Sequence, residues 1–192
     1  MNNDERTDPF PELMIRYQGG DQAAFDEIYR LTVGSIESYL GRWARSTARD
    51  DLVQETYLQM HRARRTYRPE LPFRPWLYAI ARHVALWSLR TRRRRWSREI
   101  GVDQYPEKTT ADPRGDVLLR QRLEEAISRL PANQQEVVWL AQVEGMSSTE
   151  ISRVIGATPG AIKVRLHRAN MKLRSWLESL APASGLKEKG ID

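Results

Sequence analysis

Cysteine is absent from this chain of 192 residues, which excludes disulfides, thiol catalysis and metal sites with cysteine ligands. No apolar run approaches the roughly 20 residues that a membrane-spanning helix needs. The first ten residues, MNNDERTDPF, lack the basic and then apolar build of a signal peptide. We therefore expect a cytoplasmic protein.

Side-chain arrangements typical of enzymes are also missing from the sequence. His83 has neither a second histidine nor a carboxylate at the spacing that helical metal ligands require. Asp50 and Asp51 are neighbours, and neighbouring residues point away from each other on a helix. Gly19 and Gly20 do not form a phosphate-binding loop. We expect no catalytic residue, no metal ion and no cofactor, so an enzyme that transfers phosphoryl groups is a poor alternative.

Positive charge is in excess, with 31 Lys and Arg against 25 Asp and Glu, a formal net charge of +6 and a pI of about 9.8. A basic balance favours a polyanionic partner. Apolar residues make up 40% and charged residues 29%, as is typical of globular helical proteins. The apolar periodicity predicts an all-α fold with two small helical domains joined by a flexible linker.

The domain boundaries follow changes in composition. Residues 98–115 are polar, contain two prolines and show no sustained period, so we expect a linker there. The first domain then covers residues 12–97, and the second covers residues 116–180. Residues 1–11 and 181–192 are expected to be loose tails.

A helix is expected from about residue 48 to residue 66, with Val53, Tyr57 and Met60 facing the core. A different face of this helix is acidic and exposes a leucine, and it comprises Asp51, Gln54, Glu55 and Leu58. Carboxylates in a first helical turn simply favour the helix dipole, and the pattern alone favours that interpretation. The alternative is a docking surface for a basic helical partner.

Residues 67–74 contain two prolines and must leave the helix. Tyr67 and Phe73 lie beside Arg68 and Arg74 in this segment. Aromatic rings next to guanidinium groups suit unstacked bases, which have a ring face and a neighbouring phosphate. The alternative is an ordinary loop whose aromatic rings cap the core.

The next helix is expected to start near Pro75 and to run into the arginine cluster at residues 90–95. One side of it is apolar and comprises Trp76, Leu77, Ile80, Ala81, Val84 and Trp87. Another side is basic and comprises Arg82, His83, Arg90 and Arg93. A basic stripe of three turns suits a phosphate backbone, although a flexible basic tail is the alternative.

Residues 147–173 have the pattern of a helix-turn-helix. Ser147 and Glu150 have the spacing of a capping box, and Gly156 can end the first helix in the left-handed conformation. Thr158 is expected to cap the second helix and Pro159 to fill its first position. An ordinary helical hairpin with a solvated basic face is the alternative, so this pattern alone does not establish DNA binding.

The chain as a whole resembles the extracytoplasmic-function (ECF, group 4) σ factors of bacterial RNA polymerase, which belong to the σ70 family. The resemblance covers about residues 12–97 and 116–178. It is carried by four motifs in family order: DDLVQETYLQMHRA (50–63), FRPWLYAIARHVAL (73–86), LPANQQEVVWLAQVEGMSSTEIS (130–152) and TPGAIKVRLHRANMKLR (158–174).

The resemblance implies roles that the pattern cannot assign, and it favours docking over the helix-dipole interpretation. It implies that clamp helices of the largest subunit of core RNA polymerase bind Asp51, Leu52, Gln54, Glu55 and Leu58, and that the flap region is a second contact. For the −10 promoter element it implicates Leu71, Phe73, Arg74, Trp76, Arg82, His83 and Arg90. For the −35 element it implicates Thr158, Gly160, Ala161, Lys163, Arg165 and Arg168. It further implies control by an anti-σ factor.

The sequence departs from the family pattern at four positions that concern base preference. His83 and Trp87 stand where asparagine and aspartate are common, and Ala161 and Val164 stand where threonine and serine are common. The alternative function is a stand-alone helix-turn-helix regulator. Such proteins usually dimerise, but the sequence offers no spare apolar dimer face, and the acidic face would then have no purpose.

Overall fold

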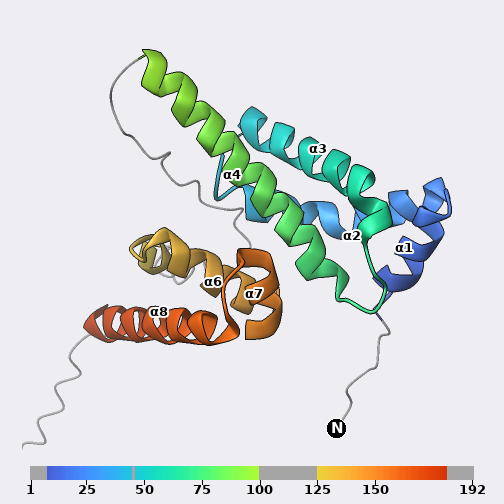
Figure 1. Ribbon diagram of the computed structural model, residues 1–192. Coiled ribbons are helices and arrows are strands. Elements are labelled where there is room, and N and C mark those ends of the chain that lie inside the picture. The colour runs from blue at the N-terminus through green and yellow to red at the C-terminus, as the bar shows by residue number, and fades with distance from the viewer. Residues whose placement is uncertain (1–7, 45, 100–124, 181–192) are drawn as a thin grey trace, which may run out of the picture. The chain divides into compact units, whose positions relative to one another are not determined.

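The structure is a computed structural model that describes residues 8–44, 46–99 and 125–180. Every regular element in these ranges is a helix, so the all-α prediction is confirmed. Helices α1 to α4 form one unit, and α6 and α8 belong to another (Figure 1). None of the described helices combines the length and the apolar character needed to cross a membrane. Most of the predicted linker lies outside the described residues.

The first unit begins with two helices that pack against each other, α1 (Phe10–Gln18) and α2 (Gln22–Leu40). We predicted a loose tail up to residue 11, but Phe10 is buried and already helical, so this prediction is wrong for residues 10 and 11. Asp21 caps α2 by accepting a hydrogen bond from the Ala24 N–H, at 3.3 Å. A hydrogen bond from Arg16, together with this cap, holds the pKa of Asp21 below its usual value.

Helix α3 (Ser46–Ala63) packs against α2 and α4, and it is followed by a short 3-10 turn, η1 (Arg64–Thr66). The predicted inward stripe of Val53, Tyr57 and Met60 is buried, as expected. The Tyr57 hydroxyl lies 2.8 Å from Thr32 Oγ1, and Thr32 donates its own proton to the Ile28 carbonyl at 2.6 Å. Tyr57 therefore donates to Thr32, and this buried pair fixes α3 on α2.

Helix α4 (Phe73–Glu99) begins two residues before the expected Pro75, and the proline stays within the first turn, where backbone N–H groups have no intrahelical partner. Leu77, Ala81 and Val84 are buried as predicted. Trp87, which we placed on the same side, is 60% exposed, so that prediction is wrong. At about 100° per residue the buried arc is narrower than the apolar pattern suggested, and Trp87 falls outside it.

The second unit contains α6 (Ala132–Gln142) and α8 (Pro159–Leu180), which pack against each other. Its core consists of Leu130, Val138 and Ala169, with Leu166 and Leu173 packed against them. Helix α7 (Ser148–Ile155) lies between them in the sequence. Ser147 directly precedes α7, in the position expected of its cap. Gly156 follows α7 with φ +73°, the left-handed conformation predicted for it.

Candidate polymerase and nucleic-acid interfaces

Four of the five residues expected to dock a partner share an accessible face of α3. Asp51 and Gln54 are exposed, Leu58 is 43% exposed and Glu55 is half-buried. The Glu55 carboxylate accepts a hydrogen bond from Gln59 Nε2 at 2.6 Å. We name Asp51, Gln54, Glu55 and Leu58 the acidic face. Its charge is carried by two carboxylates of a chain that is basic overall.

Leu52, the fifth predicted docking residue, belongs to the core. Its side chain is only 6% exposed, next to the buried stripe of α3. The i, i+4 periodicity explains this placement, because Leu52 lies one turn before Thr56, which is fully buried and donates its hydroxyl proton to the Leu52 carbonyl. Direct contact of the Leu52 side chain with a partner is therefore not supported.

The position of the acidic face within α3 bears on the helix-dipole interpretation. The helix begins at Ser46, so its first turn contains no acidic residue and Asp51 is already in the second turn. Favourable interaction with the dipole falls off within the first turn. The carboxylate of Glu55 lies one further turn along, so the dipole does not account for either charge.

The rings of residues 67–74 cap the core of the first unit. Tyr67 and Phe73 are 4% and 0% exposed. Phe73 stacks on Phe10, and its ring centroid lies 5.8 Å from those of Tyr67 and Trp76. Phe73 is therefore a core residue and not an accessible platform for a base, which corrects the expectation for this residue. The alternative interpretation, an ordinary loop whose aromatic rings cap the core, is therefore correct for Tyr67 and Phe73.

Two other predicted residues of this segment do reach the surface. Leu71 is 44% exposed, and Arg74 is exposed. Leu71 is held by a tight turn, because its N–H donates to the Arg68 carbonyl at 3.0 Å and its own carbonyl accepts from the Tyr67 hydroxyl at 2.9 Å. Burial raises the pKa of Tyr67 to about 12, so this hydroxyl remains a donor at neutral pH.

The same loop is anchored from α1. The side-chain amide of Gln18 donates to the carbonyl oxygens of Arg64, at 2.7 Å, and Tyr67, at 3.0 Å. One side chain thus fixes the turn between α3 and the loop. Nothing in the sequence pattern pointed to Gln18, because a glutamine near a helix end is usually solvated.

A groove of about 310 Å³ lies between α3 and α4. Its lining comprises Gln59 and Ala63 of α3 with Trp76, Ala79, Ile80, His83 and Val84 of α4. Two of the predicted −10 contacts, Trp76 and His83, therefore meet at one surface feature. Arg90 is exposed further along α4, and Arg82 is half-buried.

The start of α8 displays the residues expected to contact the −35 element. Thr158 Oγ1 accepts a hydrogen bond from the Ala161 N–H at 3.2 Å, so the predicted cap is confirmed. Gly160, Lys163 and Arg168 are exposed, while Ala161 and Arg165 are half-buried. Val164 is 49% exposed among them. The N-terminal half of α8 therefore presents cations beside a small apolar side chain.

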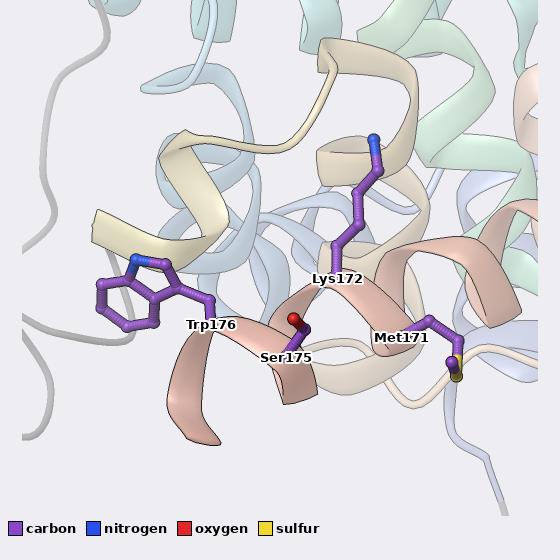
Figure 2. Close-up of a pocket in the computed structure, with 4 residues that line it drawn as sticks. All are labelled: Met171, Lys172, Ser175 and Trp176. Atoms are coloured by element: carbon purple, nitrogen blue, oxygen red, sulfur yellow. The ribbon is translucent and has the colours of Figure 1, made fainter. Parts of the chain in front are cut away.

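A second hollow, of about 460 Å³, lies along the C-terminal half of α8 and is lined by Met171, Lys172, Ser175 and Trp176 (Figure 2). All four residues come from one helix, so the hollow is a shallow surface. The guanidinium carbon of Arg129 lies 5.1 Å from the centroid of the Trp176 ring. This contact ties the segment before α6 to α8. Within the described ranges, no cluster of three or more His, Asp and Glu side chains could hold a metal ion.

Comparisons with known proteins identify the families that the two parts of the chain match. The family model described as sigma-70 region 2 matches residues 25–95, and the model described as sigma-70 region 4 matches residues 120–173. The first match covers α3 and most of α4, and the second covers α6, α7 and most of α8. A stand-alone helix-turn-helix regulator would explain only the second match.

Curated relatives extend the similarity over most of the chain. The RNA polymerase sigma factor CarQ of Myxococcus xanthus is 34% identical over 168 residues, which are 87% of this chain and 97% of that protein. The ECF RNA polymerase sigma factor SigF of Caulobacter vibrioides is 33% identical over 177 residues, which are 90% of this chain and 94% of that protein.

Two solved structures share the fold. CnrH, in complex with the cytosolic domain of CnrY, has a TM-score of 0.67 at 24% identity and covers 91% of this chain and 100% of that one. The sigma factor RpoE of Bartonella quintana, in complex with the anti-sigma factor NepR, has a TM-score of 0.68 at 23% identity. This match covers 80% of the present chain and 96% of the RpoE chain. Both region matches and the full-length relatives lead to one conclusion: the chain belongs to the ECF group of the σ70 family, and it is a transcription initiation factor of bacterial RNA polymerase.

Proposed function

We propose that this chain docks on core RNA polymerase through the acidic face of α3 and brings the enzyme to a two-part promoter. The observation that carries the docking proposal is the exposure of Asp51 and Leu58 on one face, beyond the first turn of α3. An accessible leucine beside carboxylates fits a basic helical surface that also offers apolar contacts. The clamp helices of the largest subunit are the proposed partner, and the flap region is the proposed second contact.

The first unit is proposed to hold the unpaired −10 strand. Leu71 and Arg74 are accessible at the loop, and Trp76 and His83 line the groove beside it. Arg82 and Arg90 add positive charge along α4. Contacts with unstacked bases release free energy only after the duplex opens, and this offsets the cost of unpairing.

The second unit is proposed to read the −35 element in duplex DNA, with the N-terminal half of α8 in the major groove. Lys163, Arg165 and Arg168 are the proposed base and phosphate contacts. The Gly160 amide lies in the first turn of α8, where backbone N–H groups have no intrahelical partner and attract phosphate, whereas the Ala161 N–H already donates to Thr158 Oγ1. The Thr158 hydroxyl already caps α8, so we assign it a positioning role.

Regulation by an anti-σ factor is part of the proposal. The support is the family resemblance and the RpoE relative, whose structure contains the anti-sigma factor NepR. Such a protein would act by covering the acidic face or the groove. Because core polymerase and promoter DNA are the proposed partners, the proposed compartment is the cytoplasm.

The test combines the purified chain with core RNA polymerase and a library of random promoters, and the transcribed members are sequenced. Transcripts that require the chain and share an upstream motif in two parts are expected. Core enzyme without the chain is the control for background initiation. DNA binding that does not depend on polymerase, with no chain-dependent transcript, would refute the proposal in favour of a free-standing regulator.

A further inference from the structure

A line of accessible side chains continues the groove along α4. Trp76, Ile80, His83, Trp87 and Arg90 follow one another at spacings of four, three, four and three residues, which keeps them on one side of the helix. At 1.5 Å per residue this line is about 21 Å long, and it follows the long green helix of Figure 1. We name these five residues the α4 ridge. Trp76, Ile80 and His83 also line the groove, whereas Trp87 and Arg90 extend beyond it.

Trp87 is the unusual member of the α4 ridge. Its side chain is 60% exposed, although an indole gains more than almost any other side chain from burial. Scattered exposed apolar residues are ordinary, but this one is continuous with a groove that already contains a second tryptophan. Neither the packing of the first unit nor the contacts proposed so far give Trp87 a role.

The charge around Trp87 favours an anionic partner. Arg90 lies three residues after it and is exposed. Among the described residues that line the groove, none is acidic. An apolar protein segment would gain nothing from the Arg90 cation, whereas the phosphates of a nucleic acid strand would.

The spacing along the α4 ridge suits an unpaired strand. His83 and Trp87 are separated by about 6 Å along the helix axis, which exceeds the 3.4 Å rise between stacked bases of one strand. Two bases held by these rings must therefore be unstacked from each other, as bases of a melted strand can be. Stacking on an aromatic ring tolerates any base, because every base has a ring face.

We propose that Trp87 is a stacking platform for one unpaired base of the promoter strand, next to a base held at the groove by Trp76 and His83. This rests on the proposed −10 function and adds a specific contact to it. Arg90 neutralises the phosphate that follows the stacked base. Stacking on Trp87 increases affinity for an unpaired strand but does not distinguish one base from another. It therefore stabilises the open promoter relative to the duplex, whichever base occupies that position.

The test measures the affinity of the polymerase holoenzyme for a fluorescent single strand of mixed sequence, about ten nucleotides long. Trp87→Phe keeps an aromatic ring, and Trp87→Leu keeps an apolar side chain without one. We expect Trp87→Leu to bind roughly 5- to 150-fold more weakly than the wild type and Trp87→Phe to retain most of the affinity. Val143→Ala is the matched control, since Val143 is equally exposed at 60% and lies at the end of α6.

A second readout locates the contact. A fluorescent base analogue is moved along the strand one position at a time, and quenching is expected at one position in the wild type and in Trp87→Phe but not in Trp87→Leu. Thermal unfolding of each variant shows that the fold is intact, because exposed substitutions change stability by only about 0.5 kcal/mol.

The outcomes separate this inference from the proposed function. If the wild-type holoenzyme binds the strand no better than core enzyme alone, the −10 proposal fails and Trp87 with it. If the wild type binds and Trp87→Leu binds equally well, only the platform is refuted. If Trp87→Leu binds DNA normally but loses affinity for a regulatory protein, the α4 ridge is a protein contact, and the inference is overturned.

Discussion

The ring of Phe73 stacks on the ring of Phe10, with centroids 4.6 Å apart and planes inclined by 21°. These are the first residues of α4 and α1, so the stack joins the starts of two helices that are far apart in the sequence. Tyr67 meets the same ring edge-on, with a centroid distance of 5.8 Å and an interplanar angle of 80°. The loop of residues 68–72 therefore starts and ends on one aromatic cluster.

Phe73→Ala is expected to act through folding and not through DNA. Removing a fully buried phenylalanine costs about 3–5 kcal/mol of unfolding free energy. Transcription from a duplex promoter and from a pre-melted promoter should fall by the same factor. Leu71→Ala, at an exposed position, should leave stability unchanged and reduce transcription more on the duplex template. A selective loss on the duplex in Phe73→Ala would show that the ring does reach DNA.

Reversing the charges of the acidic face should strongly weaken polymerase binding. The double substitution Asp51→Lys and Glu55→Lys replaces two carboxylates with cations that repel a basic partner. Binding to core enzyme, measured by fluorescence anisotropy, should weaken at least about tenfold, while the melting temperature stays near that of the wild type. Asp26→Lys is the control, because Asp26 is an exposed carboxylate on α2. If the double variant and the control bind core enzyme equally well, the assignment of the acidic face as the docking surface is refuted.

Two leucines of α3 should behave in opposite ways. Leu52→Ala removes a buried side chain and should cost about 2–5 kcal/mol of unfolding free energy. Leu58→Ala removes an exposed side chain and should change stability by no more than about 0.5 kcal/mol but weaken polymerase binding. Urea unfolding and a core-binding titration on the same two variants separate the effects. A stability loss in Leu58→Ala would place it in the core instead.

Lys163→Ala and Arg165→Ala should alter how the −35 element is read. A good bidentate contact to a base is worth about 1–3 kcal/mol of discrimination, whereas a phosphate contact weakens all sequences alike. Promoter profiling with each variant should show relaxed preference at one or two −35 positions. Lys172→Ala, further along α8, is the matched control for loss of a cation. An unchanged base profile in both variants would refute these contacts.

Alkaline pH should unfold the first unit partly through its buried tyrosines. Burial raises the pKa of Tyr57 above its usual range, and that of Tyr67 to about 12. Above about pH 10 the unfolded chain loses these protons first, so it binds fewer protons than the folded chain and stability falls as pH rises. Tyr57→Phe should lower stability at pH 7 by about 1 kcal/mol and flatten this alkaline decline. Tyr29→Phe, at an exposed position of α2, should leave stability at pH 7 nearly unchanged.

Helix starts, turns and most core positions were predictable from local chemistry. Thr158 and Pro159 marked the start of α8, and Gly156 marked the end of α7, because these residue types satisfy helix ends in specific ways. The stripe of Val53, Tyr57 and Met60 followed from helical periodicity. These features depend on neighbours within a few residues of the chain.

The errors concern residues whose surroundings are set by distant segments. Phe73 resembled a surface aromatic beside arginines, but Phe10 of α1, outside the local pattern, buries it. Leu52 was expected to contact a partner because it lies in the family motif, but such a motif contains core residues as well as contact residues, and Leu52 is buried. Trp87 resembled a core residue because it is apolar and follows the helical spacing of the buried residues of α4. Within the described residues, however, no element covers that side of α4, and the side chain is exposed.

The two hydrogen bonds of Gln18 have a consequence for how this protein can vary. Since the loop that carries Leu71 takes its shape from a side chain on α1, a change at residue 18 and a change in the loop should not act independently. Genetic screens for altered promoter opening should therefore recover substitutions in α1 that touch no DNA. In evolution, residue 18 of the N-terminal helix and the loop that it holds should therefore vary together.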